Sequence, residues 1–279
     1  MRQIIAISLS VFLGSANVFG WGPEGHAIIA AVAEARLTNA TRDTALALLG
    51  NQTLASIASW ADEVRAQRDY TYNWHFVDIP KSSNAFLESR DCFLPADKHQ
   101  GAATDHQNCV VDRITLFEQA LATAGGNREE ALKFLVHFVG DVHQPFHSIG
   151  DAAGGNTIRI SLFGSTNCPF RGKNAPCNLH SAWDDGLIEH TGRSQSQYVT
   201  FIQSLITQQH LDANQPGQPA DWANAAHKLA QAAWVNQGGS IDQTYFNAQI
   251  NVVNTQLALA AIRLANAIEQ TLGANPGAR

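Results

Sequence analysis

The chain lacks any long hydrophobic run after its first 20 residues. A helix needs roughly 20 consecutive apolar residues to cross a bilayer, so we expect a protein without a membrane span. The first 20 residues differ: Arg2 precedes an apolar run from Ile4 to Leu13, and small residues lead to Gly20. This pattern is typical of a secretory signal peptide. We expect residues 1–20 to be removed, the mature chain to begin at Trp21, and the protein to be secreted or periplasmic.

A basic surface is also missing. The sequence holds 18 Lys and Arg against 24 Asp and Glu, a formal net charge of −6. Proteins that bind nucleic acid through broad, non-specific phosphate contacts are rich in Lys and Arg, which argues against that class. Any attraction for phosphate must be local, and a bound divalent cation can supply it because its charge outweighs the side chains around it. The 11 histidines make metal binding worth testing.

Cysteine is scarce, with four residues in a chain of 279. An even set in an exported protein favours two disulfides over reactive thiols. Three pairings are possible, and we favour the local one, which joins Cys92 to Cys109 and Cys168 to Cys177.

Repeats and linkers are absent as well, so the economical interpretation is one mainly α domain over residues 21–279. Apolar residues recur at helical spacing, and the helices we expect span 27–37, 44–49, 54–67, 128–144, 179–190, 197–211, 219–236 and 244–272. Pro145 ends or kinks the fourth of these. Residues 155–164 alternate like a strand, and we expect a short β-hairpin there.

Two pairs of side chains share one spacing. His137 and Asp141 in "HFVGD", and His180 and Asp184 in "LHSAWD", are each four residues apart. On a helix this spacing places both side chains on the same face. A single pair of this kind is more often a surface hydrogen bond than a pair of metal ligands, so either pair alone is a weak indication.

Three more side chains of the same types lie near tryptophans: Asp62 in "SWADE", His75 in "NWHFVD" and His26 in "WGPEGH". Each has an ordinary alternative. Asp62 fits an exposed helix residue, His75 a hydrogen-bonded core histidine, and His26 a helix-start residue. Imidazole nitrogens and carboxylate oxygens are nevertheless donors that zinc prefers, and independent ordinary explanations for all of these residues become improbable together.

The motifs "WGPEGH", "SWAD", "WHFVD", "HFVGDVHQPFH", "GGN" and "LHSAWD" occur in this order over residues 21–184. In order and in most spacings the set resembles the zinc-dependent single-strand nucleases and 3'-nucleotidases of fungi and plants, the nuclease S-one/P-one type. The closing "LALAAIRLANAI" is similar to the last helix of that family. The resemblance implies a mainly α, single-domain fold of the phospholipase C/nuclease P-one type that holds three Zn²⁺ ions.

Carried over by motif, the implied metal ligands form three sets. The first ion takes Asp62, His75 and His137; the second takes His26 with the amine and carbonyl of Trp21; the third takes His147, His180 and Asp184. Asp141 bridges the first two ions. His143 lies within a motif and is expected to orient a ligand, whereas the remaining histidines, His99, His106, His190, His210 and His227, are expected at the surface or in packing.

The resemblance also implies a reaction. A hydroxide between two zinc ions attacks phosphorus, with Asp62 and Asp141 as the catalytic carboxylates. The P–O3' bond of single-stranded DNA or RNA breaks to leave 5'-phosphates, and 3'-nucleotides are substrates as well. We expect the protein to act as a monomer.

Substrate contacts are implied at Phe76, which stacks on a base, and at Asp78, which hydrogen-bonds the edge of that base. Asn156 in "GGN" is a candidate phosphate contact, and Lys81 is a weaker one. Phe76 as a core residue and Asn156 as a turn residue are the alternatives. The loop from Cys168 to Cys177 is longer than the family pattern and lies close in sequence to the third ligand set, where it could alter substrate access.

Two other functions are considered. A zinc-dependent bacterial phospholipase C resembles this family in fold, but its last ligand is a glutamate, whereas this chain has Asp184. A non-catalytic zinc-binding protein would be expected to carry flexible His-rich tracts, and the sequence has none.

Overall fold

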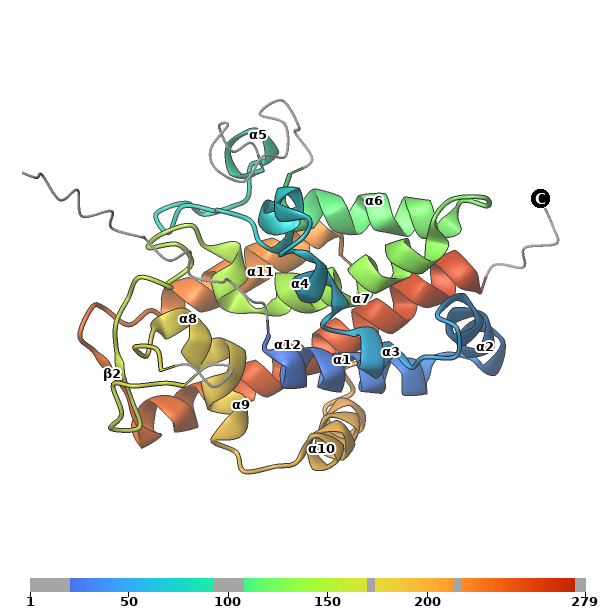
Figure 1. Cartoon of the computed structure of the whole chain (residues 1–279). Coiled ribbons are helices and arrows are strands. Elements are labelled where there is room, and N and C mark those ends of the chain that lie inside the picture. The colour runs from blue at the N-terminus through green and yellow to red at the C-terminus, as the bar shows by residue number, and fades with distance from the viewer. Residues whose placement is uncertain (1–20, 93–107, 170–173, 213–216, 274–279) are drawn as a thin grey trace, which may run out of the picture.

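The computed structural model describes residues 21–92, 108–169, 174–212 and 217–273. The expected signal peptide, His99, His106 and the last six residues lie outside them. The described chain is mainly helical, as predicted (Figure 1). Its elements are α1 (Pro23–Arg36), α2 (Asn39–Leu48), α3 (Leu54–Ile57), α4 (Trp60–Val64), η1 (Asp69–His75), α5 (Glu88–Asp91), α6 (Val110–Ala122), α7 (Arg128–His143), η2 (Pro145–Ser148), β1 (Ser161–Leu162), α8 (Leu179–Ser181), the π-helical turn η3 (Ala182–Gly186), α9 (Leu187–Glu189), α10 (Gln195–Gln208), α11 (Pro219–Ala232), β2 (Ser240–Ile241) and α12 (Gln243–Leu272).

Helix α7 lies at the centre of the fold. It packs against α6, α12, α11 and α1, and Figure 1 shows α1, α7 and α12 crossing in the middle of the molecule. Every α7 residue from Phe134 to His143 is buried. One cluster of buried hydrophobic side chains reaches from Trp21 to Leu272. Each fully buried large apolar side chain contributes about 1.5–3 kcal/mol, so the helix that carries the "HFVGD" motif is held firmly by the core.

The ends of α7 follow from its sequence. The Asn127 side chain accepts a hydrogen bond from the Glu130 N–H and caps the first turn. At the other end Pro145 cannot continue the helix, and the chain turns at Gln144 into the short helix η2. The turn sends His147 in a new direction from His137 and Asp141.

The single helix predicted over 54–67 is wrong, because the chain breaks between Ile57 and Trp60 into α3 and α4. The Ala58 carbonyl accepts a hydrogen bond from Nδ1 of His137 at 2.7 Å. This tertiary bond takes an acceptor that a continuous helix would use four residues later. Helix α6, which no sequence pattern singled out, packs along α7.

The expected strand over 155–164 shrinks to β1, which pairs in parallel with the distant β2. Antiparallel pairing of the expected hairpin survives only as isolated bridges among the described residues, such as Arg159 with Asn178. Gly154 and Gly155 have φ of 62° and 82°, so the predicted range begins in a left-handed turn and not in a strand.

Both predicted disulfides are present, Cys92–Cys109 and Cys168–Cys177. Part of the loop between Cys168 and Cys177 lies outside the described residues. Within the described ranges, no helix combines the length and hydrophobicity that a membrane span requires.

Candidate metal centre

The first group of ligand-type side chains gathers around α7. Asp141 Oδ2 lies 3.0 Å from His75 Nδ1 and 3.3 Å from His137 Nε2. Asp62 Oδ1, from α4, lies 3.7 Å from His75 Nδ1 and 3.8 Å from His137 Nε2. All four side chains are buried. Elements far apart in the sequence therefore bring two imidazoles and two carboxylates to one enclosed point.

The distances between these nitrogen and oxygen atoms can be compared with the distances between donor atoms around a zinc ion. A tetrahedral zinc ion with bonds of about 2.0 Å holds its donor atoms about 3.3 Å apart. The measured distances of 3.0–3.8 Å bracket that value. The donor set of two His and two Asp also suits zinc chemically, so these residues fit a zinc ion.

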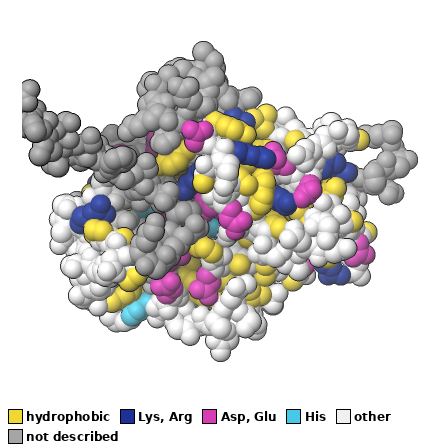
Figure 2. Space-filling model, viewed as in Figure 1, with side chains coloured by type: hydrophobic (Ala, Val, Ile, Leu, Met, Phe, Trp, Pro, Cys, Tyr) yellow, Lys and Arg dark blue, Asp and Glu magenta, His cyan; other side chains and the backbone are white. Residues whose placement is uncertain are grey.

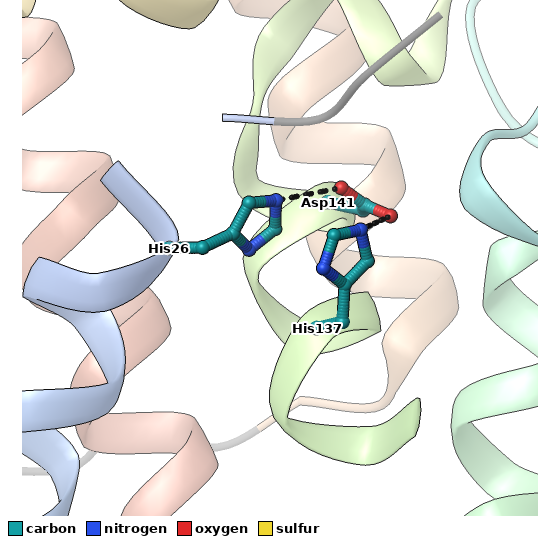
Figure 3. A group of neighbouring side chains, drawn as sticks. All are labelled: His26, His137 and Asp141. Carbon is teal, nitrogen blue, oxygen red and sulfur yellow. Dashed lines mark ion pairs between the residues drawn. The ribbon is translucent and has the colours of Figure 1, made fainter. Parts of the chain in front are cut away.

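His26 completes a second group from the opposite side of Asp141. Its Nε2 lies 3.2 Å from Asp141 Oδ1, and its ring stacks on His137 with centroids 3.9 Å apart. Figure 3 shows His26 reaching from α1 toward one oxygen of Asp141 while His137 meets the other. Asp141 thus offers one oxygen to each group, which is the geometry of a bridging carboxylate.

The third group joins His147 from η2 with His180 and Asp184 from the helical run that starts at α8. Nε2 of His147 and Nε2 of His180 face each other at 3.1 Å, and Asp184 Oδ2 lies 3.5 Å from His180 Nε2. The Nδ1 atoms of the two rings are 2.6 Å from the His75 carbonyl and 2.7 Å from the Gly154 carbonyl. Carbonyls only accept, so each Nδ1 carries a proton, and the close contact of the two Nε2 atoms needs either a second ring proton or a metal ion between them.

The predicted helix over 179–190 contains the π-helical turn between these ligands. Because the turn is wider, the relative direction of the His180 and Asp184 side chains differs from that of an ordinary α-helical i, i+4 pair. Such π-turns recur at functional sites. The spacing in sequence predicted that the two side chains lie close together, which they do, but no sequence pattern indicated the wider turn.

Electrostatics in the first two groups centre on Asp141. Burial lowers the pKa of His26 to about 4 and that of His75 to about 3. Burial opposes the charge of His137 too, but Asp141 and Asp62 outweigh it and raise the pKa of His137 to about 9. Burial would raise the pKa of Asp141, but His137, His147 and His26 hold it well below its usual range. The Asp62 and Asp141 carboxylates thus favour positive charge beside them. One proton on His137 balances only part of their negative charge.

Unpaired atoms support the same conclusion. Nε2 of His26, Nε2 of His137 and Oδ1 of Asp141 are buried without a hydrogen-bond partner among the described residues. Each such atom costs about 1–3 kcal/mol if left unsatisfied. A metal ion in each of the two groups would satisfy these atoms.

The start of the described chain lies beside this centre. Trp21 is fully buried, and the Gly22 N–H donates to the Asp184 carbonyl at 3.0 Å. The Gly22 carbonyl in turn accepts from the His26 N–H at 3.1 Å. The backbone next to Trp21 therefore lies between the second and third groups.

The predicted base-binding residues lie on one edge of the third group. The Val77 N–H donates to the His147 carbonyl at 2.8 Å, so the segment that follows His75 runs alongside η2. Phe76 and Asp78 are half-buried, whereas Val77 and Ile79 are buried. Phe76 is extended, with φ of −148°. The alternation places Phe76 and Asp78 together on the outer side of the segment. This position disfavours a core role for Phe76.

Asn156 has a turn role in the structure, because its side-chain amide donates to the Ala153 carbonyl at 2.9 Å. It is buried close in sequence to Gly154, whose carbonyl holds His180. Lys81 lies farther along the chain from Phe76, with its ammonium 4.3 Å from the centroid of the Trp234 ring.

Sequence reasoning missed two residues at the centre. Arg65 is buried, with a guanidinium nitrogen 3.8 Å from Asp62 Oδ1 and its charge over the Tyr72 ring. Gly140 lies against His26, where a Cβ would approach Nδ1 to 2.7 Å. Their signals were weak but real: an arginine three residues after Asp62, and a glycine within a helix, where it is unfavourable.

The other histidines divide as the structure places them. His143 is buried, with Nδ1 2.7 Å from the Val139 carbonyl and Nε2 2.7 Å from Arg263. Burial and the Arg263 guanidinium lower the pKa of His143 to about 3. His227 is also buried, and its ring nitrogens lie 2.8 Å and 3.0 Å from the Ser148 and Ser83 carbonyls. Its packing role therefore extends to the segment directly after His147.

Residues 21–273 match the family model described as S1/P1 Nuclease. The chain belongs to the S1/P1 nuclease family. It is 26% identical over 296 residues to Endonuclease 2 of Arabidopsis thaliana, which covers 97% of this chain and 98% of that protein. It is 30% identical over 288 residues to Nuclease P1 of Penicillium citrinum, which covers 91% of this chain and 98% of that protein.

This result confirms the family to which the motifs pointed. An S1/P1 nuclease is a hydrolase that cleaves phosphodiester bonds, and its substrates are nucleic acids. An acidic chain then needs concentrated positive charge at the site. On the face seen in Figure 2, Lys and Arg side chains are interspersed with acidic and uncharged ones rather than gathered into one broad basic surface.

Proposed function

We propose that this S1/P1 nuclease is a zinc-dependent endonuclease of single-stranded DNA and RNA, with 3'-nucleotidase activity. One observation carries the proposal: buried His and Asp side chains converge in three groups, with donor separations that suit zinc. We assign the first Zn²⁺ to Asp62, His75 and His137, the second to His26 with the Trp21 amine and carbonyl, and the third to His147, His180 and Asp184. Asp141 bridges the first two. A further cluster, Cys92, Cys109 and Asp112, is unsuitable because its thiols form a disulfide.

Zinc at these positions would neutralise phosphate oxygens and activate water at neutral pH. The protein's own contribution is orientation. The Asp62 and Asp141 carboxylates would bind the metal ion and hold it between α4 and α7. Arg65, next to Asp62, supplies a permanent cation for a phosphate oxygen. Cleavage of the P–O3' bond would leave a 5'-phosphate on the product.

Preference for single strands is assigned to Phe76 and Asp78. A base can stack on an aromatic ring and present its edge to a carboxylate only after it leaves the duplex stack. The half-exposed position of Phe76 beside the third group suits this contact. Asn156 is proposed to help shape the phosphate site through its turn.

We further propose that residues 1–20 direct export, that cleavage before Trp21 creates the amine ligand, and that residues 21–279 act as one catalytic domain and as a monomer. The export and cleavage proposals rest on the signal-like sequence and on the buried position of Trp21, and the single domain rests on the family match over residues 21–273.

The test is an assay of purified mature protein on single-stranded DNA, RNA, duplex DNA, a 3'-nucleotide and a phosphatidylcholine analogue, with and without a chelator. We expect single strands to be cleaved fastest and the chelator to abolish the activity. The variant Asp141→Ala should lose activity and bound zinc together, because it removes the bridge. Phospholipid turnover without nucleic acid cleavage would refute the proposal, as would an Asp141→Ala variant with unchanged rate and metal content.

A further inference from the structure

Gln144 is a fully buried amide between two of the ligand groups. It directly follows α7, three residues after Asp141 of the first group and three before His147 of the third. No sequence pattern marks this residue, and it is not among the proposed metal ligands.

Its polar atoms connect both groups. The backbone N–H donates to the Asp141 carbonyl at 3.0 Å, and the backbone carbonyl accepts from the His147 N–H at 3.0 Å. The side-chain Oε1 accepts from the Phe146 N–H at 2.6 Å, and Nε2 donates to Asp184 Oδ1 at 2.5 Å. A backbone N–H can only donate, so Oε1 must face Phe146 and the NH₂ group must face Asp184.

The contact with Asp184 determines which oxygen remains available. Gln144 holds Oδ1, whereas Oδ2 faces His180 Nε2 at 3.5 Å. A hydrogen bond to a carboxylate is stronger than one between neutral groups. Asp184 therefore presents a single oxygen to the third group.

We propose that Gln144 is a positioning residue for the third metal site: it fixes Asp184 for binding through one oxygen and couples that site to the end of α7. This inference rests on the proposed zinc function. Packing alone does not require an amide, because a methionine of similar size would fill the same volume. Hydrogen-bond partners of metal ligands typically change metal affinity by about 10- to 100-fold when removed.

Two variants separate this role from a purely structural one. Gln144→Met removes both side-chain hydrogen bonds, whereas Gln144→Glu keeps an acceptor for the Phe146 N–H and loses the donor to Asp184. A positioning role predicts that both variants weaken zinc binding at the third site by about 10- to 100-fold. A structural role through Phe146 predicts a loss in Gln144→Met alone.

The measurement is zinc titration of metal-free mature protein against a chromophoric chelator, with thermal unfolding of each metal-free variant. Asn254→Leu is the matched control. Asn254 is also a buried amide, but its oxygen accepts from the Tyr198 hydroxyl at 2.6 Å, and Tyr198 is not a proposed ligand. We expect the control to lose stability while it keeps all zinc affinities.

Wild-type zinc affinities in Gln144→Glu would overturn the inference and leave the proposed function intact. If the wild-type protein binds zinc but cleaves no nucleic acid, and if both Gln144 variants bind the third zinc ion more weakly, the proposed function would be overturned and the inference supported.

Discussion

Gly140 and His26 are in direct contact: the imidazole occupies the space where any larger residue at 140 would place its Cβ. Glycine inside a helix costs about 1 kcal/mol relative to alanine. Helix α7 therefore gives up stability at this point to admit the His26 ring beside Asp141.

The variant Gly140→Ala should displace His26 while it favours the helix. We expect loss of the zinc ion assigned to His26 and at least about a tenfold fall in activity, as for disturbed metal ligands elsewhere. Metal content and rate should be measured together. Gly126→Ala is the control, because a Cβ there would meet only atoms 3.8 Å or more away. Full zinc content in Gly140→Ala would show that the ring has room to move.

The pH dependence of metal-free protein should reveal the buried histidines. The ordinary pKa is 6.5, and burial lowers that of His26 to about 4 and that of His75 to about 3. As pH falls from 6.5 toward these values, the unfolded chain takes up protons that the folded chain does not. The free energy of unfolding should therefore decrease as pH falls through this window, by about 1.4 kcal/mol per pH unit for each histidine.

His137 acts in the opposite direction, because Asp141 and Asp62 raise its pKa to about 9 despite burial. The protonated His137 contributes its full share to the free energy of unfolding below pH 6.5, and this share is lost as pH rises through 9. Zinc would replace this proton, so its addition should remove the alkaline loss. Urea unfolding from pH 4 to 10, with and without zinc, tests both statements. A metal-free protein whose stability did not change between pH 6.5 and 9 would contradict the role of His137.

Phe76→Leu should weaken binding of single strands. Stacking of a base on an aromatic ring contributes about 1–3 kcal/mol, so KM for an oligonucleotide should rise by about tenfold or more. Zinc content should not change, because Phe76 is not a proposed ligand. Phe76→Tyr keeps the ring and serves as the control. Equal KM values for all three proteins would remove Phe76 from the proposed base site.

A chain that keeps extra residues before Trp21 should lack the proposed amine ligand. We expect such a protein to bind one zinc ion less tightly and to be weakly active, while the same protein trimmed to begin at Trp21 recovers both properties. Metal analysis and activity before and after specific proteolytic trimming provide the measurement. Full zinc content in the extended form would make the position of Trp21 incidental.

The sequence predicted which ligand-type residues pair along one helix, because i, i+4 pairs depend on local spacing. His137 with Asp141, and His180 with Asp184, do lie close together. It failed where a distant group competes with a local pattern. The break at Ala58 depends on a hydrogen bond from His137, 79 residues away. Gln144 escaped notice for the same reason, because its partner Asp184 is 40 residues distant.

Helix α7 belongs at once to the core and to the candidate metal centre. If the proposed metal sites are occupied, we therefore expect loss of the metal to loosen the core as well. Where a chelator removes the metal, we expect proteases to digest the chain faster than the metal-bound protein. Digestion with and without a chelator would measure this difference. The lifetime of the enzyme, and not only its rate, would then depend on the metal supply around it.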